Sequence, residues 1–354
     1  MAHSNETRGF NNIRNSQVEK RKQKKTVQQY TLIAIAGLAA LTVAMLVVLT
    51  IGGIAQNIWP DWFNPNKGPA HEKVEWAERN VAAADTLHGP LVLVNADHKY
   101  TFPATDDHLG NLYDNWASHS PRIYKYSGLS KGHMAQVALE PLDQMLMDFH
   151  AATGKDNVIL RYAYRSENDQ QELLDKGSST TPVGHSDHHT GMGIQLRYTN
   201  GDNTYLLSSD ETYDWLYDNC HKYGFVVRYP EGKEEITGVE DYTDYFRYVG
   251  VAHATYMKAN NLCMEEYVEL LKTNYTDHKK PLGIEAADGL YYEVYYAAET
   301  LYYPTNYAYE VSGTNEGGVI VTIARSETAE PEAPADGNTT TTADDDNTTT
   351  ANEQ

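Results

Sequence analysis

The sequence has little cysteine, and this limits how the chain can be cross-linked. Its 354 residues include only two cysteines, Cys220 and Cys263, so at most one internal disulfide is available. Both lie in partly apolar segments with helical patterning. Such positions favour two separate buried thiols over a bridge between them.

Positive charge is also scarce, and its distribution is uneven. The chain has 28 Lys and Arg against 49 Asp and Glu. Residues 1–30 hold seven of the basic and two of the acidic residues, so the remaining chain carries a formal charge of about −26. Nucleic acid is bound largely through Lys and Arg contacts to phosphate, so a surface this acidic excludes it as a partner. Solubility is the simplest reason for the excess of acidic residues.

One long apolar run is present, at residues 31–55, and it contains no charged residue. At about 1.5 Å per residue, a helix of this length would cross the roughly 30 Å core of a bilayer. Basic residues crowd its N-terminal side, and Trp59 and Trp62 follow it. This predicts a single-pass membrane protein with a cytoplasmic N-terminus and an extracellular C-terminal domain. A cleaved signal peptide is the alternative, but the run is too long and lacks a clear cleavage site.

Composition divides the rest of the chain. Besides the predicted transmembrane helix (31–55), we expect a basic cytoplasmic tail (1–30), a stalk (56–90) with a short polar helix near 72–84, a folded domain (91–272), a β appendage (285–325) and a disordered acidic, Thr-rich tail (326–354). Helical and strand patterns alternate loosely in the folded domain, which predicts an α+β fold. Alternating apolar residues predict strands in the appendage, and the tail has almost nothing to bury.

Local signals place several elements of the folded domain. The apolar run Leu91–Val94 predicts a strand, and apolar residues at helical spacing predict a helix that ends at Gly154. Ser166 followed by Asp169 predicts the N-cap of another helix. A further helix is expected to end at Gly224.

The densest cluster of candidate metal ligands lies between Gly184 and Gly191, where three histidines and an aspartate occur together. Imidazole nitrogen is a good zinc ligand, and glycines let the backbone approach closely. On spacing alone, a metal site and a polar surface loop both remain open.

A resemblance to a known family begins in this cluster, which reads Ser186-Asp187-His188-His189-Thr190-Gly191-Met192-Gly193-Ile194-Gln195. It resembles the Ser-x-His-x-x-Gly-x-Ala-x-Asp signature of the VanY-type D-alanyl-D-alanine carboxypeptidases, zinc enzymes that trim peptidoglycan stem peptides. Three more stretches are similar to that family in order and spacing: Tyr164-Arg165-Ser166 with Gln170, residues 223–233, and Phe246-Arg247-Tyr248-Val249-Gly250. The resemblance covers about residues 91–271 and implies the family's LAS-type (hedgehog-like) fold.

The resemblance also implies a degenerate metal site. His188 matches the first zinc ligand of the family, but the aspartate ligand falls on Gln195 and the second histidine on Tyr245. The glutamate that acts as general base falls on Tyr242. Catalytic zinc needs three protein ligands and an open position, and an amide and a phenol with a pKa near 10 are poor substitutes. We therefore expect zinc to be absent or weakly bound here, and the peptidase to be inactive.

A rebuilt metal site is the main alternative. Six groups close to the missing positions could reach a metal after a small shift: His185, Asp187, His189, Glu240, Asp241 and Asp244. Strand alternation argues against it, because Gln195 is expected to face the pocket while its neighbours face away.

The part of the site that binds substrate is retained. The resemblance implies that Arg165, Ser166, Gln170 and Ser186 contact the carbonyl and the C-terminal carboxylate of the peptide. The planar fork of an arginine matches both oxygens of a carboxylate, although a buried structural ion pair is an equal interpretation of Arg165.

Three functions remain after this reasoning. The first is a membrane-anchored, extracellular, non-catalytic protein that binds peptidoglycan stem peptides ending in D-Ala-D-Ala. The second is an active zinc carboxypeptidase with a rearranged site. The third is a protein-interaction module whose pocket is filled by tyrosines and whose partner docks elsewhere.

Overall fold

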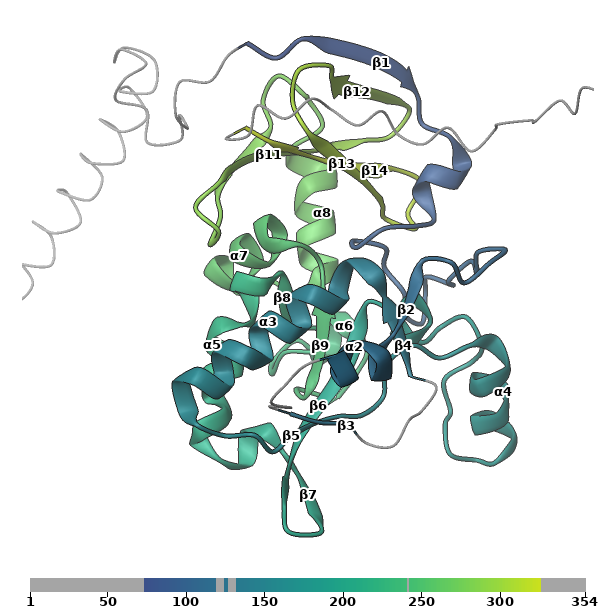
Figure 1. Cartoon of the computed structure of the whole chain (residues 1–354). Coiled ribbons are helices and arrows are strands. Elements are labelled where there is room, and N and C mark those ends of the chain that lie inside the picture. Colours follow the sequence, from purple (N-terminus) through teal and green to yellow (C-terminus); the bar gives the residue numbers. More distant parts are fainter. Residues whose placement is uncertain (1–72, 119–123, 127–131, 241, 326–354) are drawn as a thin grey trace, which may run out of the picture. The chain divides into compact units, whose positions relative to one another are not determined.

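The computed structural model describes residues 73–118, 124–126, 132–240 and 242–325 (Figure 1). The predicted tails (1–30 and 326–354) and the apolar run (31–55) lie outside these residues. The predicted localisation, a single-pass membrane protein with an extracellular domain, is corrected here. In the described part of the chain, no helix is long and apolar enough to cross a bilayer.

Six strands form the central sheet: β3 (Lys125–Tyr126), β5 (Val158–Leu160), β6 (Gly193–Asn200), β7 (Asn203–Leu206), β8 (Phe225–Val227) and β9 (Tyr245–Tyr248). Their order is β3-β5-β6-β9-β8, and β7 pairs with β6. The β3–β5 pair is parallel and the other pairs are antiparallel. The first half of β6 pairs with β9, and this register sets Gln195 directly opposite Tyr245.

The helices of the described chain are α2 (Leu112–Ser118), α3 (Gln136–Thr153), α4 (Glu167–Asp175), α5 (Asp214–Asn219), α6 (Glu234–Thr237), α7 (Val251–Asn260) and α8 (Met264–Asn274). Short 3-10 helices are η2 (Ala83–Thr86), η3 (Asp187–Thr190), η4 (Leu207–Ser209), η5 (Glu211–Tyr213) and η6 (Cys220–Tyr223). A short antiparallel pair, β2 (Leu109–Asn111) with β4 (His133–Ala135), precedes α3.

Helix α3 supplies one side of the main core (Figure 1). Its apolar residues recur every three or four positions, and the buried ones pack with side chains from the sheet, including Leu160, Leu196 and Phe246. Gly154 ends the helix with a φ of 70° and donates to the carbonyl of His150. The predicted helix and its stop are therefore confirmed, because a left-handed residue at this point favours glycine.

Two further local predictions are confirmed. Ser166 caps α4, since its hydroxyl accepts from the amide of Asp169 and the Asp169 carboxylate accepts from the amide of Ser166. Gly224, with a φ of 78°, ends the helical stretch made by η5, α5 and η6.

A second sheet follows α8 in the sequence. Its strands are β10 (Leu282–Glu285), β11 (Tyr291–Ala297), β13 (Tyr309–Gly313) and β14 (Val319–Ala324), in the order β10-β11-β14-β13. Apolar side chains of α7, α8 and this sheet share one core, which includes Met257, Leu271 and Val294. The predicted strands of this region are confirmed, while the division of the chain into domains stays a prediction.

The predicted short helix near 72–84 is wrong, because most of this segment is extended. Strand β1 (Trp76–Asn80) pairs with β12 (Thr300–Pro304), and η2 follows it. The Trp76 ring packs edge-on against Tyr295, with centroids 6.4 Å apart. A partner more than two hundred residues away decided the conformation of a polar segment with weak local preference.

The predicted strand at Leu91–Val94 is also wrong, although its burial was expected. All four side chains are at most 1% exposed, but their backbone is irregular. The amide of Leu91 donates to the Ser312 hydroxyl and that of Leu93 to the Thr314 carbonyl. An apolar run indicates burial, and only a neighbouring strand would have made it a β-strand.

Both cysteines are free and buried, as the sequence predicted. Burial raises the pKa of the Cys220 thiol and of the Cys263 thiol to about 12. Neither thiol is therefore reactive at neutral pH, because the thiolate is the nucleophile.

Candidate functional site

The candidate site is built where η3 leads into β6. The carbonyl of His188 in η3 accepts from the backbone amide of Arg165, 3.1 Å away, so the two segments are tied together. Gly191 closes η3 in the left-handed region, with a φ of 68°. The chain can then turn directly into β6, which carries Gln195 beside Tyr245 of β9.

The His188 ring is held in one tautomer. Its Nδ1 lies 2.8 Å from the carbonyl oxygen of Ala163, and a carbonyl only accepts, so Nδ1 carries the proton and Nε2 keeps a lone pair. Burial, and then the charge of Arg165, lowers the pKa of His188 to about 3. The ring is therefore a neutral acceptor at physiological pH.

Tyr245 fills the space beside this ring. It is completely buried, its ring stands edge-on to His188 with centroids 4.6 Å apart, and its hydroxyl donates to Asp187 over 3.1 Å. It also stacks on Tyr242, at 5.4 Å, and on Tyr229, at 5.9 Å. Burial raises the pKa of Tyr245 well above its ordinary value. The result is a wall of three tyrosines with a protonated phenol at its base.

Gln195 turns toward a carboxylate. It is 2% exposed, and its Nε2 donates to Asp244 over 3.0 Å. Arg197 donates to the same Asp244 oxygen over 2.7 Å. The Gln195 Oε1 is buried without a hydrogen-bond partner among the described residues. Gln195 thus sits where the sequence placed it on the strand, but it supplies an amide that is already bonded.

A buried ion-pair network lies behind the tyrosines. Asp187 accepts from Arg247 over 2.5 Å and from Arg228 over 3.3 Å. Arg228 also donates through both terminal nitrogens to Glu265. Although burial raises the pKa of Asp187, the charges of Arg247 and Arg228 leave it below its ordinary value. The Asp187 carboxylate is therefore ionised and neutralised by two arginines.

The nearby histidines of the rebuilt site are engaged elsewhere. His189 Nδ1 lies 2.7 Å from the carbonyl of Arg165, and its Nε2 accepts from the amide of Gly184. His185 Nδ1 lies 2.9 Å from the carbonyl of Asn95. These hydrogen bonds hold the loop in place and occupy both ring nitrogens of His189 and one of His185.

The acidic groups of the rebuilt site are also not available to a metal ion. Asp187 and Asp244 are paired with arginines, Glu240 is exposed, and Asp241 lies outside the described residues. Within the described chain, no group of three or more His, Cys, Asp or Glu could hold a metal ion. The zinc ion implied by the resemblance therefore does not fit, since one imidazole faces a bonded amide and a bonded phenol.

A cavity of about 450 Å³ opens beside these groups. Five of the eight residues proposed from the sequence line it: Arg165, Ser186, His188, Tyr242 and Tyr245. Hydroxyl-bearing residues 178–181 and residues 237–239 complete much of the wall. Arg165 is the one Lys or Arg among the lining residues of the described chain, and the one lining carboxylate, Asp187, is already paired with Arg228 and Arg247. An anion is therefore the ligand that the wall favours.

Gln170 orients the arginine from behind. It is fully buried, and its Oε1 accepts from Arg165 Nη1 over 2.8 Å. Its amide nitrogen donates to the carbonyl of Thr181, at 2.6 Å, and to the hydroxyl of Ser179, at 3.0 Å. Burial lowers the pKa of Arg165, yet a guanidinium stays charged in proteins. No carboxylate of the described chain lies within ion-pair distance of Arg165, which disfavours the structural ion pair.

Three residues proposed from the sequence do not line the cavity. Gln170 and Gln195 lie behind its wall, and Ser166 caps α4. Two participants were missed. Tyr229 stacks on Tyr245, and Gly193 is the only position in the signature where a glycine replaces the family's alanine. The replacement of alanine by Gly193 was visible in the sequence and could have indicated a change in packing at this position.

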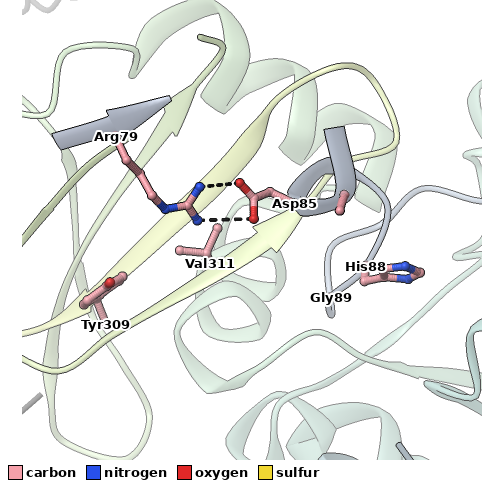
Figure 2. A pocket seen from close by; sticks show the side chains of 7 residues that line it. Arg79, Asp85, His88, Gly89, Tyr309 and Val311 are labelled. Carbon is pink, nitrogen blue, oxygen red and sulfur yellow. Dashed lines mark hydrogen bonds and ion pairs between the residues drawn. The ribbon is translucent and has the colours of Figure 1, made fainter. Parts of the chain in front are cut away.

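A second cavity, of about 460 Å³, also contains an arginine (Figure 2). Arg79 of β1 reaches Asp85 of η2 beside Tyr309 and Val311 of β13. Both terminal nitrogens of Arg79 donate to the Asp85 carboxylate, at 2.5 and 3.2 Å. The charge of this arginine is satisfied within the chain, so the cavity around Arg165 remains the better candidate.

Comparison with known proteins agrees with this geometry. Residues 131–251 match the family model "VanY: D-alanyl-D-alanine carboxypeptidase". A D-alanyl-D-alanine carboxypeptidase of Enterococcus faecium is 28% identical over 258 residues, which cover 71% of this chain and 80% of that protein. The bifunctional D-Ala-D-Ala dipeptidase and carboxypeptidase VanXYC of Enterococcus gallinarum is 31% identical over 135 residues, 34% of this chain and 71% of that protein.

The fold is shared as well. The crystal structure of the vancomycin resistance D,D-dipeptidase VanXYg, in complex with a D-Ala-D-Ala phosphinate analogue, superposes with a TM-score of 0.59 at 24% identity. The match covers 72% of this chain and all of that one. With the signature loop, the sheet register and these relatives in agreement, the chain belongs to the VanY family of D-alanyl-D-alanine carboxypeptidases.

Proposed function

We propose that this protein binds the C-terminal end of peptidoglycan stem peptides and does not hydrolyse them. The observation that carries the proposal is the Arg165 guanidinium. It is held by Gln170 at the wall of a cavity, and no carboxylate of the described chain pairs with it. Beside it, the positions of two zinc ligands hold groups that are bonded within the protein.

A terminal carboxylate suits this cavity chemically. The free N–H groups of Arg165 can donate to both carboxylate oxygens, and such charge-assisted pairs are about twice as strong as neutral hydrogen bonds. His188 Nε2 can accept from a peptide N–H, because its Nδ1 proton is committed to Ala163. The relatives are named for D-Ala-D-Ala, and we assign that ending to the ligand of this chain.

Hydrolysis lacks its two usual agents in this site. Without zinc there is no metal-activated water and no Lewis acid to polarise the scissile carbonyl. Burial, and then the charge of Asp244, raises the pKa of Tyr242 to about 12. A phenol with that pKa stays protonated at pH 7, so Tyr242 cannot replace a carboxylate base. Loss of a positioned base alone costs about 10² to 10⁴ in rate.

Calorimetry with a pentapeptide ending in D-Ala-D-Ala tests the proposal. We expect a Kd between about 1 µM and 1 mM, and at least tenfold weaker binding of the same peptide with an amidated C-terminus. Arg165→Gln should abolish measurable binding. Arg161→Gln is the matched control, because Arg161 contacts the exposed Tyr162 and does not line the cavity. No heat at millimolar peptide would remove the proposal.

The two alternatives predict different measurements. A zinc carboxypeptidase would retain about one equivalent of zinc after dialysis and would release D-alanine from the pentapeptide. An interaction module with a filled pocket would bind no peptide and would be unaffected by Arg165→Gln. The remaining cavity of about 450 Å³, lined by Arg165 and His188, favours peptide binding over the filled pocket.

A further inference from the structure

Gly193 and Tyr245 share one small space from neighbouring strands. A Cβ atom on Gly193 would lie 2.0 Å from the Tyr245 Oη, 2.4 Å from its Cζ and 2.9 Å from its Cε1. Non-bonded atoms do not approach a Cβ atom this closely, so any side chain at position 193 requires the Tyr245 ring to move. The backbone itself does not require glycine, because Gly193 is not among the residues with positive φ.

The Tyr245 ring is held in place by several neighbours. Its hydroxyl donates to Asp187, which two arginines fix in place. Its ring packs against Tyr242, Tyr229 and His188, and none of its surface is exposed. The hydroxyl of this side chain is thus held by a hydrogen bond, and its ring is held by contacts with three other rings. Moving the ring to make room for a side chain at position 193 would break these contacts, so overpacking here is destabilising.

Tyr245 also stands where the ligand positions of the family converge. Gln195 is its direct partner across β6 and β9, and such cross-strand Cβ atoms lie roughly 4.5–5.5 Å apart. The His188 ring is also next to it, with its centroid 4.6 Å from that of Tyr245. The phenol therefore occupies the place that a shared metal ion would need.

We infer that the replacements at positions 193 and 245 are coupled. Glycine in place of the family's alanine makes room for a tyrosine in place of the family's histidine, and the phenol fills the metal position. Missing ligands are then only part of the reason why this chain does not fit zinc, because the position itself is filled. The inference does not depend on which ligand the cavity takes. It makes binding at the cavity indifferent to zinc and to chelators.

A double-mutant cycle on the full-length chain tests the coupling. Gly193→Ala normally stabilises a strand, but here it should lower the Tm by about 3 to 8 °C. In a Tyr245→His background the same change should leave the Tm unchanged or raise it. Tyr245→Phe is the control background, because it keeps the ring atom that lies 2.4 Å from the added methyl group, so Gly193→Ala should still lower the Tm.

An equal effect of Gly193→Ala in all three backgrounds would overturn the coupling. If the single variant does not fold, the double variant with Tyr245→His provides the measurement. Recovery of folded protein supports the inference, and failure to recover contradicts it.

Zinc binding tests the filled position. After dialysis against zinc, we expect less than about 0.1 equivalent on the native chain and on Gln195→Asp, and about one equivalent on Gln195→Asp with Tyr245→His. Adding His188→Ala to that pair should return the value to the baseline. Stoichiometric zinc on the native chain or on Gln195→Asp would overturn the inference, and so would no zinc on the pair.

Discussion

Gln170 carries no charge and does not line the cavity, yet the proposed function depends on it. Its side chain links Arg165 to the backbone of Thr181 and the hydroxyl of Ser179, so one amide holds both the arginine and the part of the cavity wall at residues 179–181. A glutamine suits this role because it accepts on one side and donates on the other. A leucine of similar size could do neither.

Gln170→Leu should therefore weaken peptide binding more than it weakens the fold. We expect affinity to fall about tenfold or more, because a hydrogen bond to a charged group contributes roughly 1.5–3 kcal/mol. Calorimetry with the D-Ala-D-Ala pentapeptide measures the effect. Gln171→Leu is the control, since Gln171 is exposed and its side-chain amide donates to Asp175 on the same helix. Unchanged affinity in Gln170→Leu would show that Arg165 needs no support from this side chain.

At the scale of single elements, α4 shows how one motif can be given two meanings. Ser166 was assigned to the substrate from the resemblance, and its hydroxyl is used as the N-cap of α4. The same Tyr-Arg-Ser stretch therefore places the arginine in the cavity and starts the helix that carries Gln170. The position of Ser166 in the motif predicted a contact with the substrate, whereas its hydroxyl bonds to the first turn of α4.

Ser166→Ala separates these meanings. A lost N-cap costs typically about 1 kcal/mol, so amide hydrogen exchange should accelerate in α4. Affinity for the pentapeptide should change by less than about twofold if the hydroxyl serves the helix. A tenfold loss of affinity with unchanged exchange in α4 would instead assign Ser166 to the ligand.

At the scale of the whole described chain, one buried histidine joins three elements that are far apart in sequence. His253 of α7 has Nδ1 2.8 Å from the Tyr267 hydroxyl of α8 and Nε2 2.9 Å from the Thr322 hydroxyl of β14. Burial lowers the pKa of His253 to about 3. The His253 ring that links the two helices to the C-terminal sheet is therefore neutral at physiological pH.

This link should make stability depend on pH. The unfolded chain has an ordinary histidine pKa near 6.5, so between pH 6.5 and 3 it binds a proton that folded His253 does not. The contribution is complete above pH 6.5 and is lost as the pH falls, by about 2 kcal/mol at pH 5. Denaturant titrations at pH 7 and pH 5 measure it. A His253→Asn variant should lose less stability over this interval, and an equal loss would contradict the assignment.

The parts of the fold that sequence could predict are those with local causes. The α3 stop at Gly154, the cap at Ser166 and the helix end at Gly224 follow from residues within one or two turns. Strand β1 could not be predicted, because its partner β12 lies more than two hundred residues away. The irregular path of Leu91–Val94 could not be predicted for the same reason, because it depends on hydrogen bonds to Ser312 and Thr314.

The candidate site divides in the same way. The resemblance gave the positions of Arg165, His188, Gln195 and Tyr245, and the sheet register then brought the last two together. The contact between Gly193 and Tyr245 depends on atoms from two strands separated by about fifty residues. The sequence shows Gly193 and Tyr245 at their positions, but it does not show that a side chain at position 193 would clash with the Tyr245 ring.

The pairing of β1 with β12 limits how this protein can be cut into pieces. A fragment that starts at residue 91 would lack Trp76 and would leave the Thr300–Pro304 edge without its neighbour. Bare strand edges recruit other chains, so such a fragment is expected to self-associate. Experiments on an isolated recognition unit therefore have to begin upstream of Trp76. Grafting residues 91–272 alone onto another scaffold would expose the apolar faces of α7 and α8 that pack on the C-terminal sheet.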